Sequence, residues 1–318
     1  MELLFAPMEG ITGYIYRKIH SEMFGGADMY YSPFIAPDST GRFKAGNLRD
    51  VLPENNIGVP LTPQILANNP DAFLAVAGEL AEMGYDTVDL NVGCPSGTVT
   101  AKHKGAGMLC DVKALDVFLD RVFSSCPIKI SVKTRLGVSN STEFENVLAV
   151  YKKYPLSRLT VHTRCASGMY KSPTEPAAFS PALEAFGDRA SYNGNIVSIE
   201  RFNSLADMYP ALASVMMGRG VIADPALMRT VKGGAKADKN EIRAFHDALL
   251  AKTLESGLFE IYTVGRMKEL WFYMSHMFPD CDKQLKAINK SKYISDYNAA
   301  VSSLFSNCAF DRDSFFPC

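Results

Sequence analysis

Short runs of β-forming residues recur eight times in the first two thirds of the chain. They cover residues 3–8, 29–35, 61–66, 87–94, 128–134, 158–163, 189–194 and 214–219. Between most of them, apolar residues recur at helical spacing, most clearly over Ala72–Met83, which ends at Gly84, and over Ala114–Phe123. Eight strands that alternate with helices over about 220 residues predict a (β/α)₈ barrel, the TIM-barrel architecture, with a doubly wound sheet as the alternative.

Three of the predicted strands have a polar face opposite an apolar one. Asn91, Lys133 and His162 each lie on the polar face of a strand whose other face is built of Val, Ile or Leu. Helices that cover a barrel leave this polar face to point toward the barrel axis. Burying such groups without partners is costly, so we expect a polar ligand at the C-terminal mouth, where barrel enzymes bind their substrates.

The strand pattern stops after about residue 235, and the remainder is predicted to be helical. Stretches 241–255, 262–277 and 296–305 carry apolar residues at helical spacing. We therefore expect a catalytic barrel over residues 1–238 and a smaller, all-helical domain over residues 239–318.

The composition is that of a globular protein without a global affinity for nucleic acid. Of 318 residues, 47% are hydrophobic and 21% are charged, which suffices to bury a core and excludes a disordered or fibrous chain. The formal net charge is −1, so an RNA-binding surface would have to be local. Lys286 and Lys290, with Lys283, form such a basic patch at helical spacing with no acidic residue between them.

Targeting signals and cysteine usage indicate the compartment. No apolar stretch approaches the ~18 residues of a membrane-spanning helix, and the N-terminal residues do not form a secretion signal. The seven cysteines are odd in number and include no C-x-x-C pair, which is typical of reduced thiols rather than of disulfides or a zinc site. We therefore expect a cytoplasmic protein without a membrane partner or a metal site.

Cys94 is the first candidate catalytic residue. It follows Asn91 at the end of a predicted strand and precedes Pro95, which places its thiol on a loop at the mouth. With an ordinary pKa of about 8.5, the thiol is protonated at neutral pH and can donate a proton. No His/Asp relay is evident nearby, which favours an acid over a nucleophile. An inert, buried thiol is the alternative interpretation.

Lys133 is the strongest single signal, because a lysine on the axial face of an apolar strand is rarely structural. His162 shares the parity of Lys133 on the next strand and is either functional or a hydrogen-bonded core residue. Gln64 and Asn193 are strand-end amides and are weak signals by themselves.

The last two predicted strands end in glycines. Gly194, Gly218 and Gly220 expose backbone N–H groups where barrels often bind phosphate, and Arg219 would add a charged donor. Two ordinary turns are the alternative. A phosphate site, a buried cation and an acid at one mouth favour a flavin mononucleotide (FMN) reductase, in which Lys133 stabilises negative charge near flavin N1 and Cys94 protonates a substrate carbon.

Seven motifs occur in an order that resembles one known family, the tRNA-dihydrouridine synthases. They are APMEG (6–10), PQI (63–65), DLNVGCPS (89–96), VKTRLG (132–137), VHTR (161–164), NGN (193–195) and MGRG (217–220). The resemblance covers about residues 3 to 225, and the helical tail resembles the family's RNA-binding domain only in place and character.

The resemblance implies an enzyme that reduces the C5=C6 bond of particular uridines in tRNA, with FMN bound and NADPH as reductant. We expect a monomer. Hydride would pass from flavin N5 to C6 while Cys94 protonates C5. The implied flavin-binding residues are Pro7, Met8, Glu9, Gln64, Asn91, Lys133, His162, Asn193, Gly194, Asn195, Gly218 and Arg219. The implied tRNA contacts are Arg135, Arg164, Tyr170, Lys286 and Lys290.

The sequence departs from the family pattern at two positions. Ser167 lies where many members have a glutamine, and NGN replaces the commoner NGD or NGE, which leaves the role of Asn195 open. Two other functions compete with the synthase. One is a small-molecule FMN reductase that resembles dihydroorotate dehydrogenase, and the other is a non-catalytic tRNA-binding protein.

Overall fold

The computed structural model describes residues 1–38, 41–43 and 45–317, so Cys318 of the predicted helical domain lies outside the described residues. All strands belong to one parallel sheet in the order β3-β2-β1-β9-β8-β7-β6-β5-β4. Their bounds are β1 (Glu2–Phe5), β2 (Met29–Tyr31), β3 (Leu61–Thr62), β4 (Gln64–Ile65), β5 (Thr87–Val92), β6 (Lys129–Arg135), β7 (Leu159–His162), β8 (Ala190–Asn193) and β9 (Ser214–Met217). The predicted barrel is confirmed, and the doubly wound alternative is wrong.

Within the described residues the sheet has nine strands rather than the predicted eight, because Pro63 divides the third predicted strand into β3 and β4. Proline has no N–H group to donate to a strand ladder. Leu61 and Thr62 pair with β2, whereas Gln64 and Ile65 pair with β5. The two halves therefore join the ends of the sheet and close the ring.

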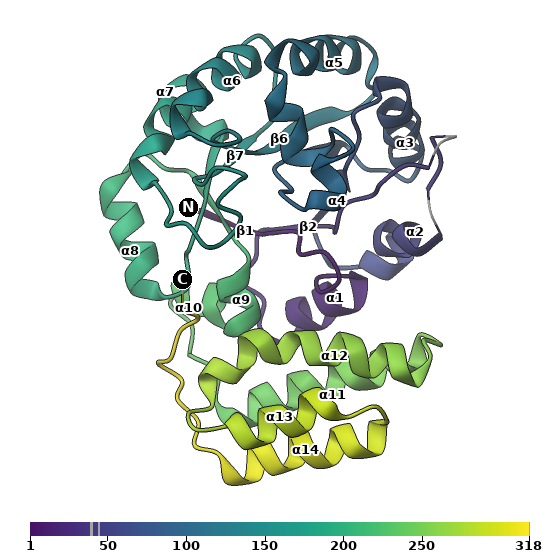
Figure 1. Cartoon of the computed structure of the whole chain (residues 1–318), viewed down its shortest axis with the longest axis vertical. Coiled ribbons are helices and arrows are strands. Elements are labelled where there is room, and N and C mark those ends of the chain that lie inside the picture. The colour runs from purple at the N-terminus through teal and green to yellow at the C-terminus, as the bar shows by residue number, and fades with distance from the viewer. Residues whose placement is uncertain (39–40, 44, 318) are drawn as a thin grey trace.

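The helices follow the strands around the outside of the barrel, and the last four form a separate layer below it (Figure 1). The α-helices are α1 (Tyr14–Met23), α2 (Ala45–Val51), α3 (Pro70–Glu82), α4 (Gly97–Thr100), α5 (Val112–Ser125), α6 (Phe144–Tyr151), α7 (Ser180–Phe186), α8 (Ile199–Met208), α9 (Arg219–Ala223), α10 (Leu227–Val231), α11 (Lys239–Glu255), α12 (Glu260–Met274), α13 (Asp282–Lys290) and α14 (Ile294–Asn307). The 3₁₀ helices are Pro53–Asn56, Gly105–Cys110, Ser141–Glu143, Pro176–Phe179, Gly187–Arg189 and Ser275–Met277.

Apolar side chains on the two faces of the strands belong to two different clusters. Val132 and Val161 are fully buried in the large core between the strands and the outer helices. Leu4, Tyr31 and Met216 form a small cluster of their own, at alternate strand positions that point toward the barrel axis. The period-two alternation in the sequence therefore reports both faces of the barrel wall.

The helical layer begins at Asp238, whose carboxylate accepts hydrogen bonds from the N–H groups of Asn240 and Glu241 and caps α11. Phe245 of α11 packs against Tyr16 and Phe24, with ring centroids 5.5 and 5.2 Å apart, and so attaches the layer to the barrel. Inside the layer, Trp271 donates to the Tyr297 hydroxyl over 2.8 Å. Each predicted helix of this region is present with slightly different ends.

None of the helices in the described part of the chain combines the length and the apolar character that crossing a bilayer requires.

Candidate active site

The polar face predicted from the sequence lies at the C-terminal ends of the central strands. Asn91 of β5 is opposite Lys133 of β6, and Arg135 of β6 is opposite His162 of β7. His162 is in turn opposite Asn193 of β8. Because all strands are parallel, these ends meet at one mouth, and four neighbouring strands each contribute a polar side chain to it.

Lys133 lies at this mouth opposite Asn91 and lines its cavity. No described residue forms a hydrogen bond or an ion pair with its ammonium group. Burial, assisted by the nearby positive charge of Arg135, lowers the pKa of Lys133 to about 8, although Asp89 acts in the opposite direction. A desolvated ammonium group without a partner favours binding of an anion.

His162 is held in its neutral form by this cationic surrounding. Its pKa lies well below the ordinary value because of burial first, and then because of Arg135, Lys133, Arg164 and Arg219. Arg164 Nη1 donates to His162 Nε2 over 3.2 Å. Since Nε2 accepts, the proton of the neutral ring is on Nδ1.

A chain of hydrogen bonds fixes the loop that carries Cys94. Asp89 accepts from Ser131 Oγ (2.6 Å) and from Gln64 Nε2 (2.7 Å). Gln64 Oε1 therefore faces Asn91 Nδ2 (2.7 Å), and Asn91 Oδ1 accepts from the N–H of Cys94 (2.9 Å). The carboxylate can only accept, so it determines the orientation of both amides and thereby the position of the Cys94 backbone.

The Cys94 thiol is half-buried and protonated at neutral pH. Desolvation raises its pKa, and a hydrogen bond from the Ser96 backbone and the charges of Arg135 and Lys133 only partly offset this effect. Arg135 Nε also donates to the carbonyl of Gly93, over 2.9 Å. A protonated thiol on a fixed loop can act as a general acid.

The other end of the mouth joins the loops after β8 and β9. Arg219 Nη2 donates to Asn195 Oδ1 over 2.7 Å, and the guanidinium carbon lies 4.9 Å from the centre of the Tyr170 ring and 5.6 Å from that of Phe316. A Cβ atom on Gly220 would lie 2.3 Å from the carbonyl oxygen of Ile196. Only glycine permits this close approach of the two loops.

Most of the residues proposed for flavin binding line one cavity of about 60 Å³ at the mouth. They are Pro7, Met8, Lys133, His162, Asn193, Gly194, Asn195, Gly218 and Arg219, and Tyr170 lies beside them. Gln64 and Asn91 are buried next to it in the hydrogen-bond chain described above. Glu9 instead lines a second, larger cavity.

The predicted tRNA contacts fall into two groups. Arg135 and Arg164 are buried at the mouth, where Arg135 Nη1 donates to the carbonyls of Cys165 and Met169, and Arg164 Nε donates to that of Ser172. The ring of Tyr170, which is 44% exposed, contacts the guanidinium groups of Arg135 and Arg219, whose central carbons lie 5.3 and 4.9 Å from the ring centre. Lys286 and Lys290 are exposed on α13, in the layer below the barrel (Figure 1).

Two contributors to the site were not among the predicted site residues. Asp89 precedes Asn91 by two positions, and this parity on a buried strand is a signal that could have revealed it. Phe316 reaches Arg219 from the C-terminal segment, and nothing in its sequence neighbourhood indicates that contact.

The residues at the mouth fit a flavin mononucleotide by their chemistry. The unpartnered Lys133 ammonium suits the negative charge of a reduced flavin ring, and Arg219 beside the loops at Gly194 and Gly218 suits a phosphate. The cavity is smaller than the roughly 300 Å³ at which ligand pockets begin. The Tyr170 ring, which is partly exposed, lines the same cavity.

A closed parallel barrel with a cationic mouth and a protonated thiol defines an enzyme of the TIM-barrel class. Residues 4–311 match the model of the family described as dihydrouridine synthase. The chain therefore belongs to the dihydrouridine synthase family.

The similar proteins include full-length relatives. A tRNA-dihydrouridine(16) synthase of Pseudomonas syringae pv. tomato is 24% identical over 314 residues, 91% of this chain and 95% of the relative. A probable tRNA-dihydrouridine synthase 2 of Bacillus subtilis is 27% identical over 232 residues, 70% of this chain and 69% of the relative.

Solved structures support the fold alone. Morphinone reductase is 13% identical with a TM-score of 0.53, over 75% of this chain and 87% of that one. The old yellow enzyme homologue from Zymomonas mobilis is 11% identical with a TM-score of 0.51, over 75% and 90%.

Proposed function

We propose that this chain reduces the C5=C6 bond of a uridine in tRNA, with FMN as its flavin and NADPH as the reductant. The observation that carries the proposal is the Lys133 ammonium group, which lines the cavity at the mouth, has no hydrogen-bond partner among the described residues and acts electrostatically on the protonated Cys94 thiol. Lys133 would hold the flavin ring at its anionic edge, and Arg219, with the backbone at Gly194 and Gly218, would hold the phosphate.

Different side chains of this protein have different roles in the reduction. When bound and reduced, FMN supplies a hydride to C6 of the uracil. The Cys94 thiol gives its proton to C5, and a proton from solvent then restores the thiol. The hydrogen-bond chain from Asp89 through Gln64 and Asn91 holds the Cys94 backbone in place during the transfer. His162 stays neutral, so it can donate or accept a hydrogen bond without adding charge.

The relatives suggest which uridine is reduced. Several of them are named for position 16 of tRNA, and they align over most of this chain. We extend that position to this chain. A monomer carries both the mouth and the helical layer, and the cytoplasm supplies both tRNA and reduced thiols.

Membership of the dihydrouridine synthase family favours the synthase over a reductase of free pyrimidines. The helical layer also favours tRNA as the substrate, because a free pyrimidine is too small to contact the exposed lysines of α13 while it lies in the mouth. The third possibility, a non-catalytic tRNA-binding protein, does not explain the protonated Cys94 thiol or the Lys133 ammonium group at the mouth.

Purified protein should be yellow, and tRNA from cells that lack this protein should lose dihydrouridine at position 16. Mapping dihydrouridine at every position in the deletion strain, with and without a plasmid copy, tests this expectation. Loss at another position would correct the assigned uridine. Unchanged dihydrouridine at every position, in a strain without a second synthase, would refute the proposed function.

The lysines of α13 should contribute affinity for any tRNA. Lys286→Glu combined with Lys290→Glu should weaken binding and reduce the dependence of log Kd on log salt by about one for each lost phosphate contact. Filter-binding titrations at several salt concentrations measure both effects. Lys113→Glu combined with Lys152→Glu, which changes the charge equally on the outer barrel helices, is the control. Equal effects of the two double variants would show that α13 is not the RNA surface.

A further inference from the structure

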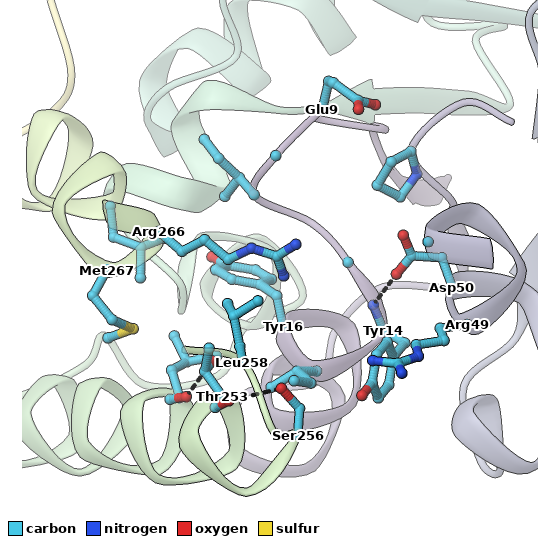
Figure 2. Close-up of a pocket in the computed structure, with 18 of the residues that line it drawn as sticks. Glu9, Tyr14, Tyr16, Arg49, Asp50, Thr253, Ser256, Leu258, Arg266 and Met267 are labelled. Carbon is cyan, nitrogen blue, oxygen red and sulfur yellow. Dashed lines mark hydrogen bonds between the residues drawn. The ribbon is translucent and has the colours of Figure 1, made fainter. Parts of the chain in front are cut away.

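A second cavity lies between the barrel and the helical layer, beside the mouth. Its volume is about 490 Å³, within the range of nucleotide-sized ligand pockets. The barrel contributes the segment from Glu9 to Tyr16 and residues around Asp50, and α11 and α12 contribute the opposite wall (Figure 2). Glu9 follows directly on Pro7 and Met8, which line the mouth, so the two cavities are neighbours.

Opposite charges face each other across this cavity. Asp50 Oδ1 accepts a hydrogen bond from the Tyr14 N–H over 2.7 Å, which fixes the carboxylate against the wall of the barrel. Arg266 extends from α12 toward Tyr14 and Asp50 (Figure 2). No described residue forms a hydrogen bond or an ion pair with the Arg266 guanidinium group, so its donors are available to a ligand.

A third charge lies at the border of the two cavities. The pKa of Glu9 is raised by burial and by the charge of Asp50, and Arg266 lowers it. Glu9 also raises the pKa of the Cys94 thiol. Glu9 and Asp50 are thus two like charges that line one cavity, and a ligand that brings hydrogen-bond donors to them would relieve their repulsion.

We propose that this cavity binds a second nucleotide of the tRNA, with a guanine base at Asp50 and a phosphate at Arg266, while the target uridine lies in the mouth. The inference rests on the proposed function. The cavity would be a specificity-determining subsite of the proposed synthase, formed jointly by the barrel and α12.

The chemistry of the walls selects the base. A carboxylate only accepts hydrogen bonds, and the N1–H and N2–H groups of guanine are two adjacent donors. Adenine and cytosine present a donor next to an acceptor, and uracil presents one N–H between two carbonyls, so each would direct a lone pair at Asp50 or Glu9. The planar fork of Arg266 matches two phosphate oxygens. The cavity thus fits a guanosine nucleotide better than the other three.

Two variants test the subsite in the full-length, FMN-loaded enzyme. Asp50→Asn keeps an oxygen that can accept from Tyr14, but it removes a charge beside the buried Arg17, so the thermal unfolding of this variant is measured first. Arg266→Gln removes a side chain without a hydrogen-bond partner among the described residues and should fold. Each should lower kcat/KM for tRNA by about tenfold to a hundredfold, while the rate of flavin reduction by NADPH stays unchanged. Asp120→Asn and Lys153→Gln, which are exposed on the far side of the barrel, make the same charge changes and should have no effect.

Nucleotide binding supplies a readout that does not depend on turnover. GMP should bind the enzyme more tightly than IMP, which lacks the 2-amino group, and Asp50→Asn should remove that difference. UMP, as a probe for the mouth, should bind the variants and the parent equally. These affinities can be measured by equilibrium dialysis.

Three results would overturn the inference. The first is kcat/KM for tRNA within twofold of the parent in both variants. The second is equal binding of GMP and IMP by the parent enzyme. The third is a loss confined to the NADPH step, which would assign the cavity to the nicotinamide nucleotide. Absence of dihydrouridine formation by the parent would instead refute the proposed function, which the variants do not test.

Discussion

Replacing Cys94 by alanine should slow dihydrouridine formation at least about a hundredfold, the scale of general acid catalysis, while FMN binding and NADPH oxidation persist. The physical reason is that the thiol is the protonated group on the loop that Asn91 fixes at the mouth. Alanine leaves the backbone hydrogen bonds intact but has no proton to give. Single-turnover reduction of tRNA by enzyme carrying reduced flavin measures the step directly.

The raised pKa of Cys94 predicts the direction of the pH dependence. The thiol remains protonated to a higher pH than an ordinary cysteine because its burial disfavours the thiolate. Uridine reduction should therefore persist through neutral pH and fall on the alkaline side, as the donor loses its proton. The alkaline limb should disappear in Cys94→Ala, where no thiol titrates.

Cys126→Ala is the matched control, since Cys126 is a half-buried thiol at the end of α5, away from the mouth. It should leave the rate of tRNA reduction unchanged. If Cys94→Ala retains the parental single-turnover rate, the proton comes from another group, and the assignment of Cys94 as the acid is wrong.

Replacing Lys133 by methionine should lower the rate of flavin reduction by NADPH by about a hundredfold to a thousandfold, the usual cost of removing one electrostatic donor. Methionine keeps the length of the side chain but removes the charge that would stabilise reduced flavin. FMN affinity should fall, and the midpoint potential of bound FMN should become more negative. Stopped-flow flavin bleaching and a spectroscopic titration of the potential measure these effects.

The same variant should stabilise the flavin-free protein. Burial lowers the pKa of Lys133 from 10.5 to about 8, so the folded state disfavours the ammonium form. Between these two values the unfolded chain binds a proton that the folded chain lacks, and the free energy of unfolding therefore rises with pH in that window. Lys133→Met should raise the Tm of the apoprotein at neutral pH and remove this contribution to its pH dependence.

Lys129→Met provides the control from the same strand. Lys129 begins β6 at the opposite end of the barrel and is exposed. It should alter neither the flavin potential nor the rate of flavin bleaching. A Lys133→Met enzyme with parental potential and rate would show that the ammonium group does not act on the flavin.

The barrel is predictable from the sequence because strands and helices alternate along it and three central strands show a period of two. Val132 and Val161 lie on the outer face of the barrel wall, and Lys133 and His162 lie on the inner face. Parallel strands bring equivalent ends together, so side chains that are far apart in the sequence can be expected at one mouth. The motif order supplies the family, which the match over residues 4–311 confirms.

The supporting contacts are less predictable, because they depend on which side chains meet after folding. Asp89 orients Gln64 across two strands, a relation set by strand register rather than by spacing. Glu9 lies next to two proposed flavin contacts in the sequence, yet it lines the neighbouring cavity because the chain turns at Gly10, which has a φ of +78°. The cavity itself needs α12, whose packing no local pattern indicates.

The ring of strands changes pairing partners at Pro63, because β3 pairs with β2 and β4 pairs with β5, and this change of partners is the seam of the barrel. The unbroken pairs of β5, β6 and β7, which carry Cys94, Lys133 and His162, lie on one side of that seam. A local opening of the ring at Pro63 would therefore leave the register of the strands that carry the proposed chemistry unchanged.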